Sequence, residues 1–140
     1  AKKTLAIGAR LGNEVIAIRS YGTECIGVDI VPYRNFVIKG DMHNLPFEDN
    51  NFDFVFTNIL DHSVYPKIFF SEVKRVLKKN GYFLIHMLID FDNDEYSVTN
   101  ITNINQMKKL AKDFKVVKIY DTDFESLSFF HFNKEFLFQK

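Results

Sequence analysis

The sequence predicts one α/β domain, residues 1–140, built around a mostly parallel β-sheet. Three observations support this prediction: short apolar segments alternate with amphipathic ones, a glycine-containing turn follows the first apolar segment, and residues 52–58 present an unbroken apolar face. Such a face is typical of a central strand that helices cover on both sides. The length is sufficient for one hydrophobic core.

Each element follows from a local pattern. Strands are predicted where β-branched and aromatic residues run between turn residues, and helices where apolar residues recur every three or four positions. The predicted strands cover residues 4–8, 24–29, 36–39, 52–58, 82–89, 115–120 and a segment within 129–138, the last two as an antiparallel edge. The predicted helices cover residues 12–21, a segment from Pro66 with Lys78 and Lys79 in its last turn and Gly81 just past it, and residues 105–114.

Two loops have unusual lengths. Only residues 30–35 separate the second predicted strand from the third, whereas a parallel crossover that carries a helix normally takes a dozen residues or more. Six extended residues span roughly 20 Å, enough to return along a short strand. We therefore expect an extended loop through Pro32 in place of the crossover helix. The longest polar stretch, residues 91–103, is predicted to form a substrate loop.

Composition narrows the class of protein. The formal net charge is zero, so no overall attraction to nucleic acid or anionic membranes is expected. No apolar run approaches the roughly 20 residues that a membrane span needs. The single cysteine, Cys25, and the lack of a secretory signal favour a reducing, cytoplasmic location. Sixteen phenylalanines and no tryptophan indicate core filling, and the four histidines show no metal-ligand spacing.

Glycine and acidic residues follow the ends of the first three predicted strands. Gly8 and Gly12 let the backbone approach a ligand, and the N–H groups of the helix that follows suit a carboxylate. Asp29 ends the second strand, where one carboxylate matches two adjacent hydroxyls. Asp41 and the Met42 N–H together match a base edge with one donor and one acceptor. The carboxyl ends of parallel strands meet at one edge, so one ligand is expected to contact all three segments.

The segment Gly-Asp-Met-His-Asn-Leu-Pro-Phe at residues 40–47, followed by Glu72 and then Arg-Val-Leu-Lys-Lys-Asn-Gly at residues 75–81, is similar to class I S-adenosylmethionine (SAM)-dependent methyltransferases of the small-molecule type. This resemblance implies a Rossmann-like seven-stranded sheet of order 3-2-1-4-5-7-6. It also implies SAM as cofactor, S-adenosylhomocysteine (SAH) as product and methyl transfer to an unidentified small-molecule or protein acceptor. The implied cofactor contacts are Gly8, Ala9, Arg10, Gly12, Asp29, Ile30, Asp41, Met42 and Asn58.

The chain departs from the family pattern in its first motif. Ala6 stands where the family has an acidic residue, and Arg10 stands where it has a middle glycine. The local charge is therefore two units more positive. Arg10 either clamps the cofactor carboxylate or fills the pocket with its bulk. The family's helices before the first strand have no counterpart here, and because Ala1 almost begins that strand, we expect the native chain to start earlier.

A general base is needed only where the acceptor keeps its proton until late in the reaction. His62, after the fourth predicted strand, titrates in the appropriate range and is the candidate catalytic or acceptor-facing residue. It is alternatively a packed loop residue, with Asp61 or Ser63 capping the next helix. His86 is predicted to lie in the core. Glu72 and Arg75, three residues apart on a helix, are predicted to form an exposed pair.

Two other functions compete with methyl transfer. A catalytically silent domain of the same fold, acting as a binding or scaffold module, is suggested by Ala6, Arg10 and the short crossover. A nicotinamide-dependent oxidoreductase would need glycine at positions 8, 10 and 13, and only Gly8 fits. A nucleic-acid acceptor is disfavoured by the neutral charge.

Overall fold

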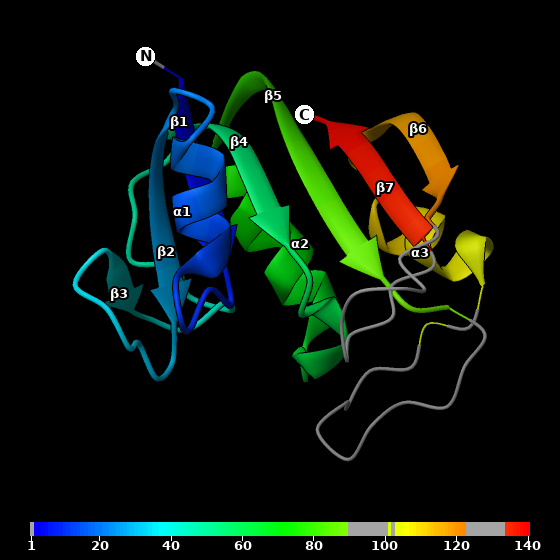
Figure 1. The fold of residues 1–140 in the computed structure, drawn as a ribbon. Coiled ribbons are helices and arrows are strands. Elements are labelled where there is room, and N and C mark those ends of the chain that lie inside the picture. The colour runs from blue at the N-terminus through cyan, green and yellow to red at the C-terminus, as the bar shows by residue number, and fades with distance from the viewer. Residues whose placement is uncertain (1, 90–100, 102, 123–133) are drawn as a thin grey trace.

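The computed structural model describes residues 2–89, 101, 103–122 and 134–140, and these form one seven-stranded sheet in the order β3-β2-β1-β4-β5-β7-β6 (Figure 1). β1, β2, β3, β4 and β5 pair in parallel, and β7 pairs antiparallel with both β5 and β6. The strands are β1 (Lys3–Ile7), β2 (Glu24–Asp29), β3 (Val37–Lys39), β4 (Phe52–Thr57), β5 (Leu77–Met87), β6 (Lys115–Asp121) and β7 (Lys134–Gln139). The predicted fold class and strand order are confirmed.

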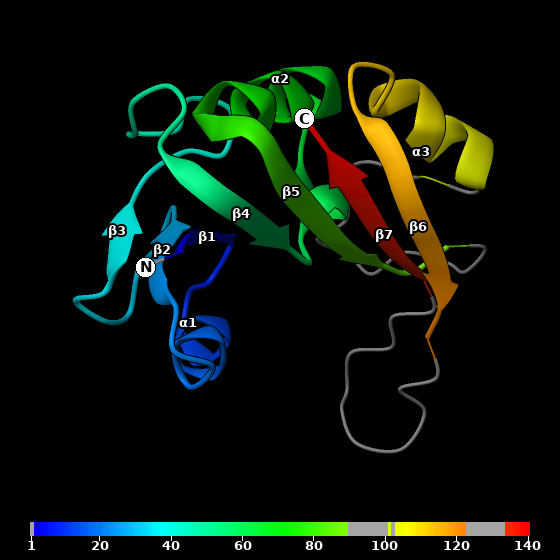
Figure 2. The same ribbon diagram turned by 90° about the horizontal axis from the view of Figure 1, so that it is seen from above.

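Helices lie on both faces of the sheet. α1 (Asn13–Arg19) covers one face at β1 and β2, and α2 (Pro66–Val76) and α3 (Ile104–Leu110) cover the other (Figure 2). A short 3-10 helix, η1 (Leu60–His62), follows β4. The result is a three-layer arrangement with uneven layers.

No helix connects β2 to β3, which confirms the prediction from the length of this crossover. The connection runs back over the turn that follows β1, where the Tyr33 N–H donates to the Arg10 carbonyl at 3.0 Å. At the end of the loop, the Phe36 carbonyl accepts from the Gly27 N–H of β2 at 3.0 Å. The short connection therefore places residues of the loop beside the first glycine turn.

Phenylalanine fills the interior between the sheet and α2, as predicted. Phe70 and Phe83 have ring centroids 5.6 Å apart at 72°, an edge-to-face arrangement that aromatic pairs prefer. The largest fully buried side chains include five phenylalanines, which we call, with Phe70, the phenylalanine core: Phe52, Phe69, Phe70, Phe83, Phe136 and Phe138.

The predicted end of the second helix is wrong. α2 ends at Val76, and the backbone of Leu77 is already extended with ψ 137°. The chain turns directly into β5 because the Leu77 side chain is fully buried beside Phe52 of β4. The left-handed residue is Asn80, with φ 63°, and not Gly81. Asparagine adopts this conformation more readily than other non-glycine residues.

The third helix is shorter than predicted. It starts at Ile104 because the side chain of Asn103 caps it by accepting from the Gln106 N–H at 3.0 Å. It ends at Leu110, yet Ala111 and Phe114 remain buried in the turns that follow. Most of the predicted substrate loop, residues 91–100 and 102, lies outside the described residues.

Cys25 is buried in β2, and burial raises the pKa of its thiol to about 11. It therefore acts as a small apolar core residue.

Within the described ranges, none of the helices has the length and apolar character that crossing a membrane requires.

Candidate cofactor-binding site

The sheet register brings the predicted site segments to one edge. Ile7 pairs with Val28 of β2 and with Thr57 of β4, and Asp29 pairs with Lys39 of β3. The residues after these four strands therefore share the carboxyl edge of the parallel strands, toward which the arrowheads of β2, β4 and β5 point in Figure 1. This is the edge at which open α/β sheets bind ligands.

The turn after β1 requires glycine at both positions that the sequence singled out. Gly8 has φ +80°, and a Cβ atom there would lie 2.3 Å from Cγ1 of Ile59. Gly12 has φ +77°, and a Cβ atom there would lie 2.3 Å from Cε2 of Phe36. Both the left-handed backbone and the close side chains disfavour any residue other than glycine at these positions. Ala9, between them, is buried.

Asp29 is held by backbone groups on both of its carboxylate oxygens. Oδ2 accepts from the Arg10 N–H at 3.0 Å, and Oδ1 accepts from the Val31 N–H at 2.9 Å. An ionised carboxylate oxygen has a second lone pair, so each oxygen still has capacity for a ligand hydroxyl. Ile30, the next predicted contact, is 64% exposed at the same edge. The carboxylate is thus oriented before any ligand binds.

Arg10 enters the site through its backbone. Its N–H binds Asp29 and its carbonyl accepts from Tyr33, while its side chain is exposed. The guanidinium has no hydrogen-bond or ion-pair partner in the part of the chain that the structure describes, and the exposed side chain does not fill space in the interior. Ala6, at the family's acidic position, is fully buried.

Asp41 forms a local turn with His43 after β3. The His43 N–H and ring Nδ1 both bind Oδ1 of Asp41, each at 2.8 Å. These bonds, the backbone one foremost, hold the pKa of Asp41 below its usual range. Met42 packs against the large core, and its N–H has no hydrogen-bond partner within the described segments. The Asp41 carboxylate and the Met42 N–H, the two groups predicted to bind a base edge, are therefore adjacent, and both can form further hydrogen bonds.

Asn58 faces the start of α1. Its Nδ2 donates to Oε1 of Glu14 at 3.4 Å, so the end of β4 is joined to the first helical turn. Thr57, fully buried, donates to the Ile7 carbonyl at 3.1 Å and joins β4 to β1. Glu14 gives no sign of this contact in the sequence, because an acidic residue in a first helical turn is ordinary.

His62 lies in η1, just beyond the end of β4, as its sequence position implies. Its side chain is 40% exposed, and Nε2 is 3.8 Å from Oδ2 of Asp61. Neither Asp61 nor Ser63 caps α2: the N-cap is Tyr65, without a side-chain cap. Ser63 is instead fully buried and binds Nε2 of His43 at 2.7 Å. The capping alternative is therefore wrong, and the role of His62 stays a prediction.

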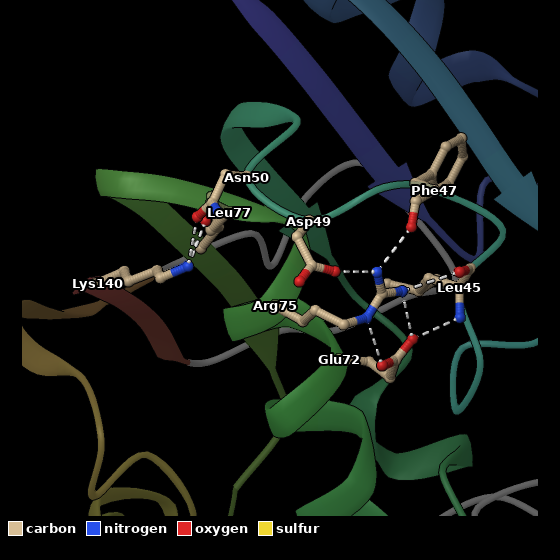
Figure 3. A network of polar contacts seen from close by, with 8 residues as sticks. All are labelled: Leu45, Phe47, Asp49, Asn50, Glu72, Arg75, Leu77 and Lys140. Carbon is tan, nitrogen blue, oxygen red and sulfur yellow. Dashed lines mark hydrogen bonds and ion pairs between the residues drawn. The ribbon is translucent and has the colours of Figure 1, made fainter.

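Glu72 and Arg75 form more than the exposed pair that was predicted. The guanidinium binds both Glu72 carboxylate oxygens at 2.8 Å, and also the carbonyls of Leu45 at 3.0 Å and Phe47 at 2.7 Å (Figure 3). Asp49 adds an ion pair at 2.9 Å, and the Leu45 N–H donates to Glu72 at 2.7 Å. The pair anchors the segment that follows Asp41 to α2. Sequence spacing could not show these bonds, because they join residues about 30 positions apart.

A further hollow lies between two helices, α2 and α3, and is rimmed by lysines 67, 74, 109 and 112. Among the described residues, no group of three or more His, Cys, Asp or Glu side chains is placed to hold a metal ion.

Comparison with known proteins agrees with this geometry. The uncharacterized protein MJ1123 of Methanocaldococcus jannaschii is 30% identical over 110 residues, covering 78% of this chain and 47% of that protein. The fatty-acid O-methyltransferase of Mycolicibacterium smegmatis is 47% identical over 49 residues, covering 34% of this chain and 18% of that enzyme. The chain thus spans less than half the length of these relatives.

A solved structure of a SAM-dependent methyltransferase from Methanosarcina mazei superposes with a TM-score of 0.81 at 16% identity, covering 99% of this chain and 92% of that chain. At this identity the likeness shows the fold. A match to the family described as "Methyltransferase domain" covers residues 5–85, more than half of the chain. The chain therefore belongs to the methyltransferase-domain family, with the class I SAM-dependent methyltransferase fold.

Proposed function

We propose that this chain binds SAM at the carboxyl edge of β1, β2 and β3 and transfers its methyl group to an acceptor. One observation carries the proposal. The left-handed glycine turn, the Asp29 carboxylate held by two N–H groups, and the Asp41–Met42 pair follow three adjacent parallel strands in the order in which SAM presents its carboxylate, ribose and adenine.

The residues present fit the cofactor. Backbone N–H groups at the start of α1 suit the carboxylate, and the free lone pairs of Asp29 suit the ribose diol. When bound, SAM would supply a methyl group activated by its sulfonium: the acceptor would attack the methyl carbon in line, and SAH would leave as the carbon–sulfur bond breaks. The protein's task is then mainly to position the acceptor.

For the acceptor, we propose a small apolar molecule with a nucleophilic oxygen, such as a fatty acid. The relative named a fatty-acid O-methyltransferase supports this class. Exposed apolar side chains at Val31, Val64 and Tyr65 flank the same edge. An ionised carboxylate has no proton to lose, so a general base is unnecessary and His62 would only orient such an acceptor.

Calorimetric titration of SAM and SAH into the chain tests cofactor binding. We expect micromolar binding of both. Asp29→Ala should weaken SAH binding by roughly 1.5–3 kcal/mol, the scale of hydrogen bonds to a charged group. Asp113→Ala, which removes an exposed carboxylate from the α3 side, is the matched control and should bind as wild type. Equal affinity for all three proteins would contradict the role of Asp29.

Transfer is tested with SAM labelled in the methyl group and a set of fatty acids, sterols and apolar alcohols. Label in an ester or ether product supports the proposed activity. SAH binding without label in any product would favour the second candidate, a silent domain of the same fold. Ala6 and Arg10, which depart from the family motif, are the specific observations behind that candidate.

A further inference from the structure

Three polar side chains form a line from the proposed adenine site into the protein. Oδ1 of Asp41 lies 2.8 Å from Nδ1 of His43, and Nε2 of His43 lies 2.7 Å from Oγ of Ser63. The Tyr65 N–H also donates to Nε2, at 3.4 Å. The order is that of a Ser-His-Asp triad, but Ser63 is fully buried, so no substrate atom can reach its hydroxyl. The line must serve another purpose.

The partners of His43 define its tautomer. An ionised carboxylate only accepts hydrogen bonds, so the Nδ1 atom that faces Asp41 carries the proton. The Tyr65 N–H only donates, so Nε2 presents its lone pair. The Ser63 hydroxyl must then donate as well. The ring, whose side chain is 16% exposed, is thereby held in one orientation from both ends.

With the ring in this orientation, the two carboxylate oxygens of Asp41 have different hydrogen-bond partners. Both His43 donors bind Oδ1, whereas Oδ2 has no hydrogen-bond partner within the described residues. The Asp41 side chain is 53% exposed, so Oδ2 is open to a ligand. The neighbouring Met42 N–H is unpaired in the same part of the structure. One acceptor and one donor therefore stand together at the edge of the site.

We propose that His43 is a positioning residue that makes the site selective for a 6-aminopurine over a 6-oxopurine; this inference rests on the proposed function. Adenine presents an amino donor at position 6 and an acceptor at N1, which match Oδ2 of Asp41 and the Met42 N–H. A 6-oxopurine presents an acceptor and a donor in these places. It would set its oxygen against the carboxylate and its N1–H against the N–H of Met42.

The test compares two ligands by calorimetry: SAH and its 6-oxo analogue, in which inosine replaces adenosine. We expect wild type to prefer SAH. His43→Leu should reduce that preference about tenfold, because the carboxylate loses the charge-assisted bond that orients it. The loss should fall on SAH alone. His43→Asn, whose amide can replace the Nδ1–H donor, should restore most of the preference.

Ser63→Ala is a second variant, which keeps the imidazole ring of His43 and removes the hydroxyl that bonds to its Nε2 atom. We expect it to lower the preference by about two- to threefold, the scale of one neutral hydrogen bond. Equal weakening of both ligands by His43→Leu, or an unchanged preference in both His43→Leu and Ser63→Ala, would overturn the role of His43 while leaving SAM binding intact. Failure of wild type to bind either ligand would overturn the proposed function itself, and this inference with it.

Discussion

The two faces of the sheet are built in different ways. Under α2 and α3, the phenylalanine core and its aliphatic neighbours bury large side chains completely. Under α1, the second cluster, which we call the small cluster, consists of Ala6, Ala9, Val15, Cys25 and Val37. Val15 is the only described side chain of α1 that is buried.

This contrast separates stability from binding. Burying large apolar side chains provides the main stabilisation of a fold, at about 25 cal/mol per Å². The small cluster provides little apolar area, but its small residues let neighbouring backbone segments approach closely. Gly27, for example, has Ala9 and Val15 so near that a Cβ atom there would lie 2.9 Å and 3.1 Å from them. The site thus lies on the face where close approach of the backbone, and not burial of large apolar side chains, determines the structure.

The largest expected effect tests the stabilising side. Phe83→Ala should lower the free energy of unfolding by about 3–5 kcal/mol, because Phe83 is fully buried in the phenylalanine core. Val15→Ala, in the small cluster, should cost about 1.5 kcal/mol, the value of two buried methylene groups. Urea unfolding measures both. Similar losses for the two variants would break the comparison between the faces.

The next effect concerns the glycine turn of the candidate site, on the α1 side of the sheet. Gly12→Ala should destabilise by about 2–4 kcal/mol, because an unfavourable φ and overpacking against Phe36 both contribute. Gly22→Ala is the matched control: φ is +81° there, but no atom lies within 4 Å of the added Cβ. It should cost about 1 kcal/mol, the value of the backbone alone. Equal losses in thermal unfolding would show that Phe36 moves aside freely.

Arg75→Ala tests the network that joins α2 to the segment after Asp41 and should cost about 2 kcal/mol, since it leaves the half-buried Glu72 and two carbonyls without their partner. Lys67→Ala, exposed on the same helix, should be neutral. Arg75 chiefly, with the Leu45 N–H, holds the pKa of Glu72 below its usual range. This stabilisation is complete above the ordinary glutamate pKa and is lost as the pH falls through the lowered one. If Arg75→Ala unfolded in acid with the same pH profile as wild type, this source of stabilisation would be contradicted.

The smallest expected effect concerns His86, which lies in β5 but is half-buried and not in the core as predicted. It lies 3.4 Å from Glu135 and packs against Phe56. Burial lowers the pKa of His86 despite this carboxylate. The unfolded chain therefore takes up the proton first, and stability should decline as the pH falls below the ordinary histidine value. His86→Gln should flatten this decline in urea midpoints between pH 7.5 and 5.5. An identical slope in the variant would count against it.

Much of the fold could be predicted because its signals are local. The spacing of apolar residues located the strands and helices, and the length of residues 30–35 excluded a crossover helix. The glycine turn and the acidic residues at strand ends located the candidate site. The errors came where a distant contact outweighs a local pattern. Lys78 and Lys79 suggest a helix end, but burial of Leu77 against the sheet starts β5 earlier.

The sequence by itself determined the strand order, through its resemblance to a family, and the order of the groups at the site. Only the tertiary structure decided which hydrogen-bond partners orient the side chains of the site. Asp29 is oriented by N–H groups from two separate loops, Arg75 reaches carbonyls about 30 residues away, and His43 joins Asp41 to the buried Ser63. Hydrogen bonds depend on distance and direction in space, and residue spacing along a chain contains neither.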